Sequence, residues 1–177
     1  MSDFIFETER LIVRQYDPAI DAENFFLLNS DKDVMRYIRK PKSREECIAF
    51  LKEIIGAYKK EPLMGRWAVI GKSTGEFVGS FAFIPVEGTE DSQLGYALLK
   101  QFWNKGYATE LMKAGNDYVF TKTALDKIYG ITEAANIASQ KVLLKSGYIL
   151  FRNYTEGVKQ LRKFILKKNK YFELTVN

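Results

Sequence analysis

The chain contains no histidine and a single cysteine, Cys47, among its 177 residues. Without histidine, Ser-His-Asp triads, Cys-His dyads and imidazole metal ligands are excluded. One cysteine cannot build an internal disulfide framework, which favours a cytoplasmic location, and we expect no metal site. Any proton transfer must therefore use a carboxylate, a Tyr, Cys, Ser or Lys side chain, or water.

Long hydrophobic runs are missing too. No apolar stretch approaches the ~20 residues that a membrane-spanning helix needs. The opening residues, MSDFIFETER, show neither the basic region nor the apolar region of a signal peptide. We therefore expect no membrane partner. A length of 177 residues, with 46% hydrophobic and 28% charged residues, fits one globular domain over 1–177.

The formal net charge of +5 is compatible with nucleic acid, an acidic membrane or a phosphate-bearing small molecule as partner. The lysines are scattered, with short clusters at 40–42, 59–60 and 167–168. No basic helix interleaved with aromatic residues is present, so we expect a solvated basic surface and no nucleic acid partner.

Patterns in the first 60 residues predict one strand and two helices. Alternating β-branched residues predict a strand over 10–16, and an Asp-Pro pair opens a helix within 17–30. The clearest helix spans 43–60, where a serine and a glutamate three residues apart match a capping box. Its predicted buried face consists of Ile48, Leu51, Ile55 and Tyr58.

The remaining predicted elements are six strands and two helices. We expect strands over 66–71, 76–84, 93–99, 127–132, 148–154 and 160–168, and helices over 107–121 and 136–146. Gly147 suits a left-handed helix end, and Gly157 suits a hairpin turn. The resulting order, β-α-α-β-β-β-α-β-α-β-β, predicts an α/β fold with a mixed sheet.

The junction before the helix over 107–121 could bind an anion. A helix start exposes unpaired N–H groups and the positive end of the helix dipole. Gly106 lets the backbone approach a bulky ligand, and Lys105 adds a mobile cation. Taken alone, this pattern also fits plain helix capping.

Two neighbouring features favour the anion site. If the strands over 93–99 and 127–132 are parallel neighbours, their carboxyl ends meet beside this junction. Asn136 and Ser139 lie three residues apart at the next helix start and so share one face. Each also has a structural interpretation, as a helix cap and as a small packing residue.

Together, QLGYALLKQFWNKGYATELM and ANIASQKVLLKSGY resemble the GNAT superfamily of acyl-CoA N-acetyltransferases. ETERLIVRQY and WAVIGKSTGEFVGSFAF also resemble its ribosomal-protein N-terminal acetyltransferase branch, and the likeness covers roughly residues 7–152. The family signature, Gln/Arg-x-x-Gly-x-Gly/Ala, reads WNKGYA here. Its first position is Trp103, as that branch often has it.

The resemblance implies a GNAT-like fold whose central strands splay to hold acetyl-CoA. The pyrophosphate would sit on the loop and helix start, the pantetheine arm would pair with one splayed strand, and an asparagine would bind the arm from the other side. The cofactor residues implied are Ala97, Leu98, Leu99, Trp103, Asn104, Lys105, Gly106, Tyr107, Ala108, Thr109, Asn136 and Ser139.

The implied reaction is direct transfer of the acetyl group to a primary amine, either a peptide or protein N-terminus or a small amine. Some relatives use a tyrosine seven residues after the asparagine as the acid, but Leu143 stands there. Other relatives, in the branch resembled here, use a serine three residues after the asparagine, which implies Ser139 as the donor to the thiolate. We expect the Leu98 backbone N–H to stabilise the oxyanion. Dimers are common among such relatives, so a homodimer is a further expectation.

The general base is open, because Gln93 stands where the branch often carries glutamate. Asp91 or Glu133, acting through water, are the candidates, and each could equally be a solvated loop charge. A second hypothesis follows from Gln93: an acyl-CoA-binding module without catalysis or with weak activity. Cys47 has no base to support a nucleophilic role, so we expect it to be packed in the core.

Overall fold

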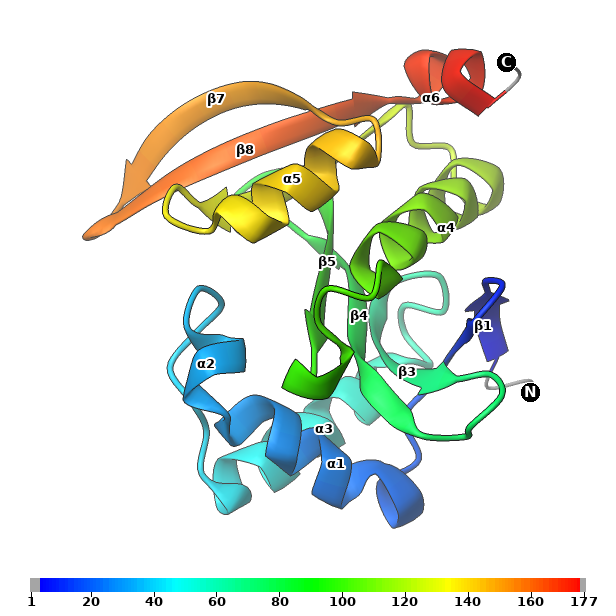
Figure 1. Ribbon diagram of the computed structural model, residues 1–177, viewed down its shortest axis with the longest axis vertical. Helices are drawn as coiled ribbons and strands as arrows, with labels where there is room; N and C mark the ends of the chain where they lie inside the picture. Colours follow the sequence, from blue (N-terminus) through cyan, green and yellow to red (C-terminus); the bar gives the residue numbers. More distant parts are fainter. Residues whose placement is uncertain (1–3, 176–177) are drawn as a thin grey trace. The chain divides into compact units, whose positions relative to one another are not determined.

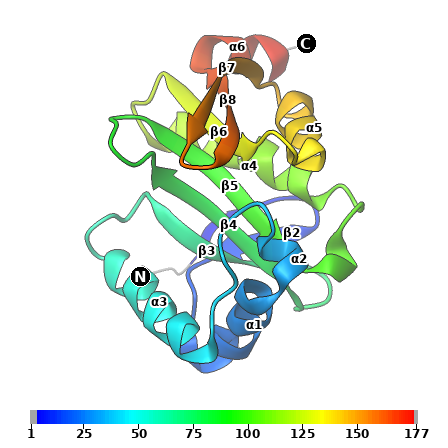
Figure 2. The same ribbon diagram turned by 90° about the vertical axis from the view of Figure 1, so that its left-hand side faces the viewer.

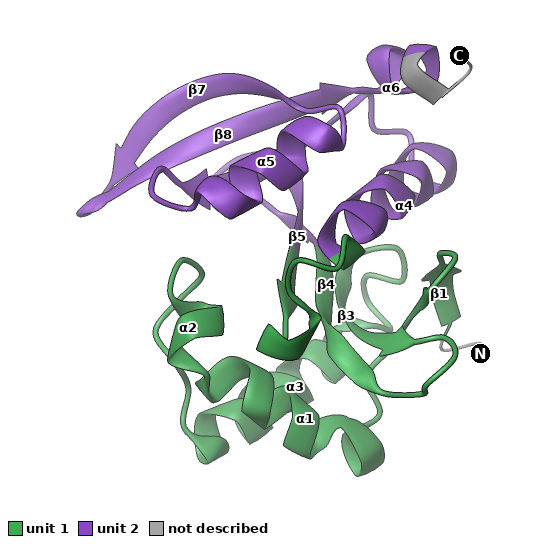
Figure 3. Ribbon diagram, viewed as in Figure 1, with its two compact units in different colours: residues 1–82, 96–107 green, residues 83–95, 108–177 purple. Residues whose placement is uncertain are grey.

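The computed structural model describes residues 4–175 (Figure 1). Two compact units divide the chain: unit 1 comprises Met1–Ala82 with Tyr96–Tyr107, and unit 2 comprises Phe83–Gly95 with Ala108–Asn177 (Figure 3). The predicted single domain over 1–177 stays a prediction. Among the described residues, no helix is both long and apolar enough to cross a membrane.

Unit 1 is built on strands in the order β1-β2-β3-β4-β5, and β4 and β5 continue into unit 2. The β1–β2 and β2–β3 pairs are antiparallel. Phe81 anchors the core, with Phe6 edge-on at 5.4 Å and Trp67 stacked at 6.3 Å between ring centroids. The bounds are β1 Phe4–Glu7, β2 Leu11–Arg14, β3 Gly65–Gly71, β4 Phe77–Pro85 and β5 Ser92–Leu98.

The helices of unit 1 are α1 (Pro18–Ser30), α2 (Lys32–Met35) and α3 (Arg44–Ala57), with a 3-10 turn, η1, at Lys100–Phe102. Helix α1 packs against α3, and the two lie side by side in Figures 1 and 2. The predicted capping box is confirmed: Ser43 accepts from the Glu46 N–H, and the Glu46 carboxylate accepts from the Ser43 N–H.

The predicted buried face of α3 is wrong in part. Ile48 is 61% exposed, whereas Cys47, Leu51, Ile54 and Tyr58 are buried. Both sets have helical spacing, and they differ by a rotation of about one residue. Because apolar residues occupy both stripes, the periodicity alone could not select the one that faces β3.

Unit 2 places its strands in the order β5-β6-β8-β7. Strands β5 and β6 are parallel and pair at Gln93 and Tyr129, while β6–β8 and β7–β8 are antiparallel. The long β7–β8 hairpin is drawn in orange in Figure 1. The bounds are α4 Tyr107–Lys122, β6 Lys127–Glu133, α5 Ile137–Lys145, β7 Ile149–Glu156, β8 Lys159–Lys167 and α6 Lys168–Thr175.

Helix α5 ends as its sequence predicts. Gly147 has a φ of +90°, and its N–H donates to the Leu144 carbonyl. The Tyr148 N–H donates to the Leu143 carbonyl, which completes a Schellman motif. The buried Tyr148 hydroxyl then donates to Asn116 Oδ1 at 2.7 Å, so the end of α5 is fixed against α4.

The parallel pair beside antiparallel pairs, with helices between the strands, confirms the α/β fold with a mixed sheet. The predicted element order omitted three elements. β1 was missed because only four residues form it and no Gly or Pro marks its turn; Thr8 closes that turn instead by accepting from the Leu11 N–H. The four-residue α2 is too short to show a period. Helix α6 was not predicted because it depends on a contact distant in sequence, the packing of Tyr171 on Phe120 of α4.

Candidate active site

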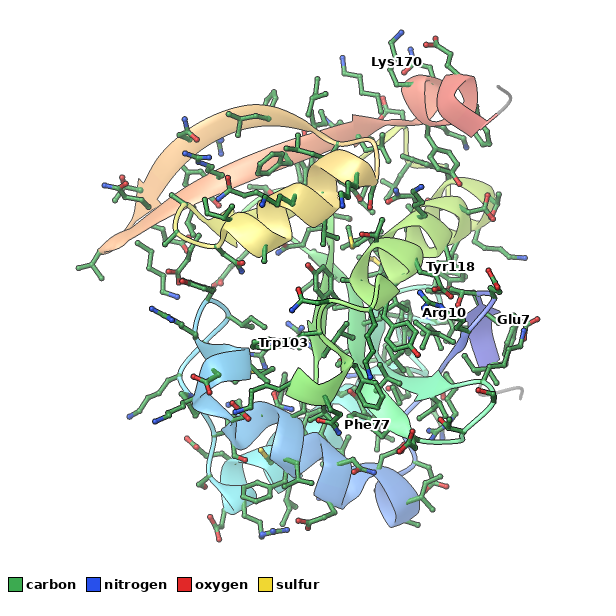
Figure 4. All side chains as sticks on the ribbon, viewed as in Figure 1. Glu7, Arg10, Phe77, Trp103, Tyr118 and Lys170 are labelled. Carbon is green, nitrogen blue, oxygen red and sulfur yellow. The ribbon has the colours of Figure 1, made fainter. Side chains whose placement is uncertain are left out.

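The loop after β5 begins with a side-chain clamp in unit 1. The Trp103 indole Nε1 donates to the Leu98 carbonyl at 2.8 Å, and the Phe102 N–H donates to the Leu99 carbonyl at 2.9 Å (Figure 4). The end of the strand and the first turn of the loop are therefore one hydrogen-bonded segment. It carries the predicted pantetheine and pyrophosphate residues of this unit.

Two residues of this loop adopt left-handed backbone conformations. Asn104 has a φ of +59°, and among the described residues it is the only non-glycine residue with a positive φ. Gly106 follows with a φ of +81°, a conformation that side chains with a β-carbon rarely adopt. The chain thus turns sharply into α4, which begins at Tyr107. Such turns aim successive backbone N–H groups toward one point, as anion sites require.

Arg10 braces the same loop. Its Nη1 donates to the Lys105 carbonyl at 3.0 Å, and its guanidinium lies 4.4 Å from the centroid of the Tyr107 ring. No local sequence pattern points to this residue, because 95 positions separate Arg10 from Lys105. The guanidinium also adds positive charge beside the proposed pyrophosphate position.

Lys105 and Lys100 differ in their availability to a ligand. The Lys100 ammonium contacts Asp31 at 3.1 Å and Asp33 at 3.0 Å, so its charge is already matched. Lys105 is exposed and has no ion pair within residues 4–175; its ammonium lies 5.6 Å from the Phe102 ring centroid. Lys105 is therefore the loop lysine that can turn to an anion.

Strand β4 approaches β5 very closely at Gly79. A β-carbon built on Gly79 would lie 2.1 Å from the Ala97 carbonyl oxygen and 2.9 Å from the Leu98 Cα. Only glycine fits there without a shift of the backbone. The Leu99 N–H donates to the Val78 carbonyl at 3.0 Å. The backbone N–H of Leu99 is therefore already used within the protein. Of Leu98 and Leu99, only Leu98 could offer its backbone N–H to a ligand.

In unit 2, the start of α5 holds the predicted Asn136–Ser139 pair together. The Asn136 side chain caps the helix by accepting from the Ser139 N–H at 3.1 Å. The Ser139 side chain is partly buried, and its hydroxyl has no hydrogen-bond partner in the part of the chain that the structure describes. Gln140 holds this turn by donating to the Ala134 carbonyl at 2.9 Å.

Both candidate bases are in ion pairs. Asp91 contacts the Lys163 ammonium at 2.6 Å, and the Lys163 side chain is only 3% exposed; Lys127 lies further away at 3.7 Å. Glu133 pairs with Lys159 at 2.5 Å, and Lys159 is 43% exposed. Asp91 is therefore bound to a buried cation, whereas the partner of Glu133 lies at the surface.

The other residues that the sequence singled out lie as follows. Leu143 is buried and packs over Gly130 of β6, where a β-carbon would lie 2.3 Å from it. Ala108 and Thr109 form part of the first turn of α4 and are partly buried. Cys47 is 2% exposed and burial raises the pKa of its thiol, which fits the predicted packing role.

No group of three potential metal ligands (His, Cys, Asp or Glu) that could hold a metal ion was found among residues 4–175.

The candidate cofactor residues form two sets. One is the continuous segment from Ala97 to Tyr107 in unit 1, and the other is the Asn136–Ser139 cap in unit 2. Within unit 2, Asp91 and Glu133 each bond a different lysine and are not brought together.

Comparison with known proteins gives a consistent family. The model of the acetyltransferase (GNAT) domain matches residues 10–149. The chain is 28% identical to the uncharacterized N-acetyltransferase YoaA of Bacillus subtilis, covering 97% of this chain and 94% of that protein.

Solved structures show the same fold. A GNAT-family acetyltransferase from Bacillus anthracis superposes with a TM-score of 0.82 at 25% identity, covering 94% of this chain and 99% of the other. RimL, a ribosomal L7/L12 protein acetyltransferase solved in complex with coenzyme A, has a TM-score of 0.78 at 15% identity, covering 93% and 97%.

The family model covers most of the chain, which confirms the resemblance inferred from the WNKGYA and ANIAS segments. The predictions of enzyme class and cofactor are confirmed with it. The chain belongs to the GNAT family of acetyltransferases, and it is an acetyl-CoA-dependent N-acetyltransferase.

Proposed function

We propose that the protein transfers the acetyl group of acetyl-CoA directly to a primary amine, either a peptide or protein N-terminus or a small amine. The observation that carries direct transfer is the position of Cys47, the chain's only cysteine: its thiol is buried in α3 with a raised pKa. A thiol in that state does not form an acyl-enzyme intermediate. An acyl-enzyme on cysteine is therefore disfavoured, and direct attack of the amine on the thioester is what membership of the GNAT family implies.

The pyrophosphate of the cofactor would bind the loop from Trp103 to Thr109. The left-handed turn at Asn104 and Gly106, the exposed Lys105 ammonium and the start of α4 support this assignment. The pantetheine arm would pair with the main chain of Ala97–Leu99, with Leu98 as the donor. Asn136 stays a cofactor ligand predicted from the sequence.

Gly106→Val should weaken CoA binding. A branched side chain at a φ of +81° costs about 1–2 kcal/mol and shifts the loop N–H groups. Since a hydrogen bond to a charged group contributes about 1.5–3 kcal/mol, CoA affinity should fall about tenfold or more. Calorimetric titration with CoA measures this.

Gly75→Val is the matched control. Its φ is +70°, nothing lies within 4 Å of the added β-carbon, and it sits in the β3–β4 turn. The control should show the same backbone strain with unchanged CoA affinity. Equal affinities for Gly106→Val and the parent protein would refute the pyrophosphate assignment.

Ser139 would donate a hydrogen bond to the leaving thiolate. Its hydroxyl has no partner among the described residues and stands in the first turn of α5. Ser139→Ala should lower kcat about 10- to 100-fold, because hydrogen bonds to charged groups contribute about 1.5–3 kcal/mol. The dissociation constant for acetyl-CoA should change little.

Ser146→Ala is the control at the other end of the same helix. The Ser146 hydroxyl is buried and has no hydrogen-bond partner in residues 4–175, so its removal should leave turnover unchanged. A parent-like kcat for Ser139→Ala, measured by thiol-reagent detection of CoA, would show that another group protonates the thiolate.

Glu133 is the better of the two candidate bases, acting through a water molecule. Its partner Lys159 is 43% exposed and can turn away into solvent, whereas Asp91 holds the buried Lys163. If Asp91 accepted a proton and lost its charge, the buried Lys163 ammonium would be left without its counterion. The proposed proton path therefore runs from the amine through water to Glu133.

The competing function is an acyl-CoA-binding module with weak or no catalysis, and Gln93 favours it, because an amide cannot accept the proton as a carboxylate would. Incubation with acetyl-CoA, a panel of amines and a thiol reagent separates the two. Release of CoA above background with any amine supports the transferase. Release with none, together with tight CoA binding, supports the binding module.

Two further proposals concern the surroundings of the enzyme. We propose the cytoplasm as the compartment. Proteins of oxidising compartments are often stabilised by internal disulfides, and a chain with a single cysteine cannot form one. A homodimer also remains a prediction, and sedimentation analysis of the full chain would decide it.

A further inference from the structure

Three cationic side chains of unit 1 surround one aromatic ring. The Arg39 guanidinium and the Lys42 ammonium each lie 5.1 Å from the Phe50 ring centroid, and the Arg66 guanidinium lies 5.7 Å from it. They come from the segment before α3 and from β3, while the ring belongs to α3. All four side chains are partly buried.

These cations have no ion-pair partner among residues 4–175. Other arginines of the same unit do: Arg14 binds Asp21 at 2.7 Å, and Arg44 binds Glu23 at 2.6 Å. Burial, followed by repulsion from Arg39, lowers the pKa of Arg66 to about 10, against weaker opposing effects of Tyr16 and Glu53. Like charges held together in a desolvated place are costly unless an anion joins them.

The cluster stands on a fixed scaffold. The Tyr58 hydroxyl donates to the Arg66 carbonyl at 2.6 Å and accepts from the Tyr16 N–H at 3.1 Å. The Tyr16 ring packs edge-on against Phe25 at 5.1 Å, and Phe25 contacts Phe50 at 5.7 Å. These hydrogen bonds hold the backbone of Arg66 in place and do not involve its guanidinium group.

A further polar group lies in the same place. The Tyr16 hydroxyl is buried and lies beside the Ser80 side chain. It interacts electrostatically with both Arg39 and Arg66. The two guanidiniums and the ammonium around the Phe50 ring are all hydrogen-bond donors, and one oxyanion could satisfy them together.

We propose that Arg39, Lys42 and Arg66 form an anion-binding site that holds a carboxylate of the amine acceptor. The acceptor is the ligand that fits, because Tyr16 beside the cluster contacts β4 at Phe77 and Ser80. The neighbouring Gly79 lies against Ala97 and Leu98, in the strand proposed to hold pantetheine. Guanidinium groups match a carboxylate in a planar, paired geometry. A singly charged carboxylate is also easier to desolvate in this partly buried place than a doubly charged phosphate. The inference rests on the proposed amine acetylation and adds its substrate class, amines that carry an acid group.

Three matched dipeptide amides test the proposal: Ala-Glu, Ala-Gln and Ala-phosphoserine. The full chain is saturated with CoA, so that no transfer occurs, and each peptide is titrated by calorimetry. We expect Ala-Glu to bind about tenfold more tightly than Ala-Gln, the effect of one charge-assisted contact. Equal affinities for this pair, or tighter binding of the phosphoserine peptide, would overturn the proposal.

Variants locate the site and separate binding from packing. Arg66→Met and Lys42→Met should each remove most of the preference for Ala-Glu, while Arg36→Met should keep it. Arg36 is a suitable control because it is exposed and its guanidinium lies 5.3 Å from the Tyr37 ring, another cation–aromatic contact. The melting temperature of Arg66→Met should stay level or rise, since repulsion is relieved. A lower melting temperature with the peptide preference retained would mean that the cations only cover Phe50.

The same peptides distinguish this inference from the proposed function. Discrimination between Ala-Glu and Ala-Gln in the CoA complex, without CoA release from acetyl-CoA, would leave the carboxylate site standing and remove the transfer reaction. Acetyl transfer to both peptides at equal rates and affinities would support the transfer reaction and overturn the carboxylate site.

Discussion

Gly79→Ala will lower the free energy of unfolding by about 1–3 kcal/mol or more and will abolish measurable CoA binding. The added β-carbon would lie 2.1 Å from the Ala97 carbonyl oxygen and 2.9 Å from the Leu98 Cα. Both neighbours are backbone atoms, so no side-chain rotation relieves the overlap. The strand that we propose to pair with pantetheine must move instead.

Gly95→Ala, on β5 itself, is the control for this change. Nothing lies within 4 Å of a β-carbon added there, and its φ is not positive. Urea unfolding and calorimetry with CoA should find this variant close to the parent protein in both respects. If Gly79→Ala kept parent-like stability and CoA affinity, the close approach of β4 to β5 would not shape the cofactor site.

Local signals predicted much of the fold because the chemistry that ends each element is local. Ser43 and Glu46 form the expected reciprocal cap, and Gly147 takes the expected left-handed conformation. Strand ends followed in the same way from the turns at Gly75 and Gly157. Each of these rules joins residues only a few positions apart.

The errors arose where contacts distant in sequence decide. The exposed side of α3 depends on what packs against it, and Cys47 and Ile54 occupy the buried stripe instead of Ile48. Arg10 reaches Lys105 across 95 positions, so its bracing of the loop is visible only in the fold. Helix α6 likewise depends on the packing of Tyr171 against Phe120.

In the candidate site, too, residues marked by local sequence could be predicted, and those that depend on distant contacts could not. The segment from Trp103 to Tyr107 could be found from the sequence, because a glycine, a lysine and a helix start adjoin one another. The environment of Asp91 could not, since its partner Lys163 belongs to a strand 72 positions away. The sequence therefore left a base candidate open that the ion pair now makes less suitable.

Asp91→Ala will cost about 3 kcal/mol of stability, the lower end of the 3–5 kcal/mol for breaking a buried ion pair, because the Asp91 side chain is 21% exposed. Among residues 4–175, the change leaves the 3% exposed Lys163 ammonium with only the Tyr129 ring, 3.9 Å away, to offset its desolvation. Lys163→Met alone should cost less, since Lys127 still contacts Asp91 and the Asp91 side chain is 21% exposed to solvent.

The double variant Asp91→Ala/Lys163→Met completes the cycle and tests the role of Asp91 in the reaction. With neither charge left buried, it should be more stable than Asp91→Ala alone in urea unfolding, because the uncompensated ammonium is gone. If Asp91 serves only to hold Lys163, acetyl transfer should recover along with stability. If Asp91 is the base, the double variant will be folded yet as inactive as the single one, and the proton path through Glu133 will have to be abandoned.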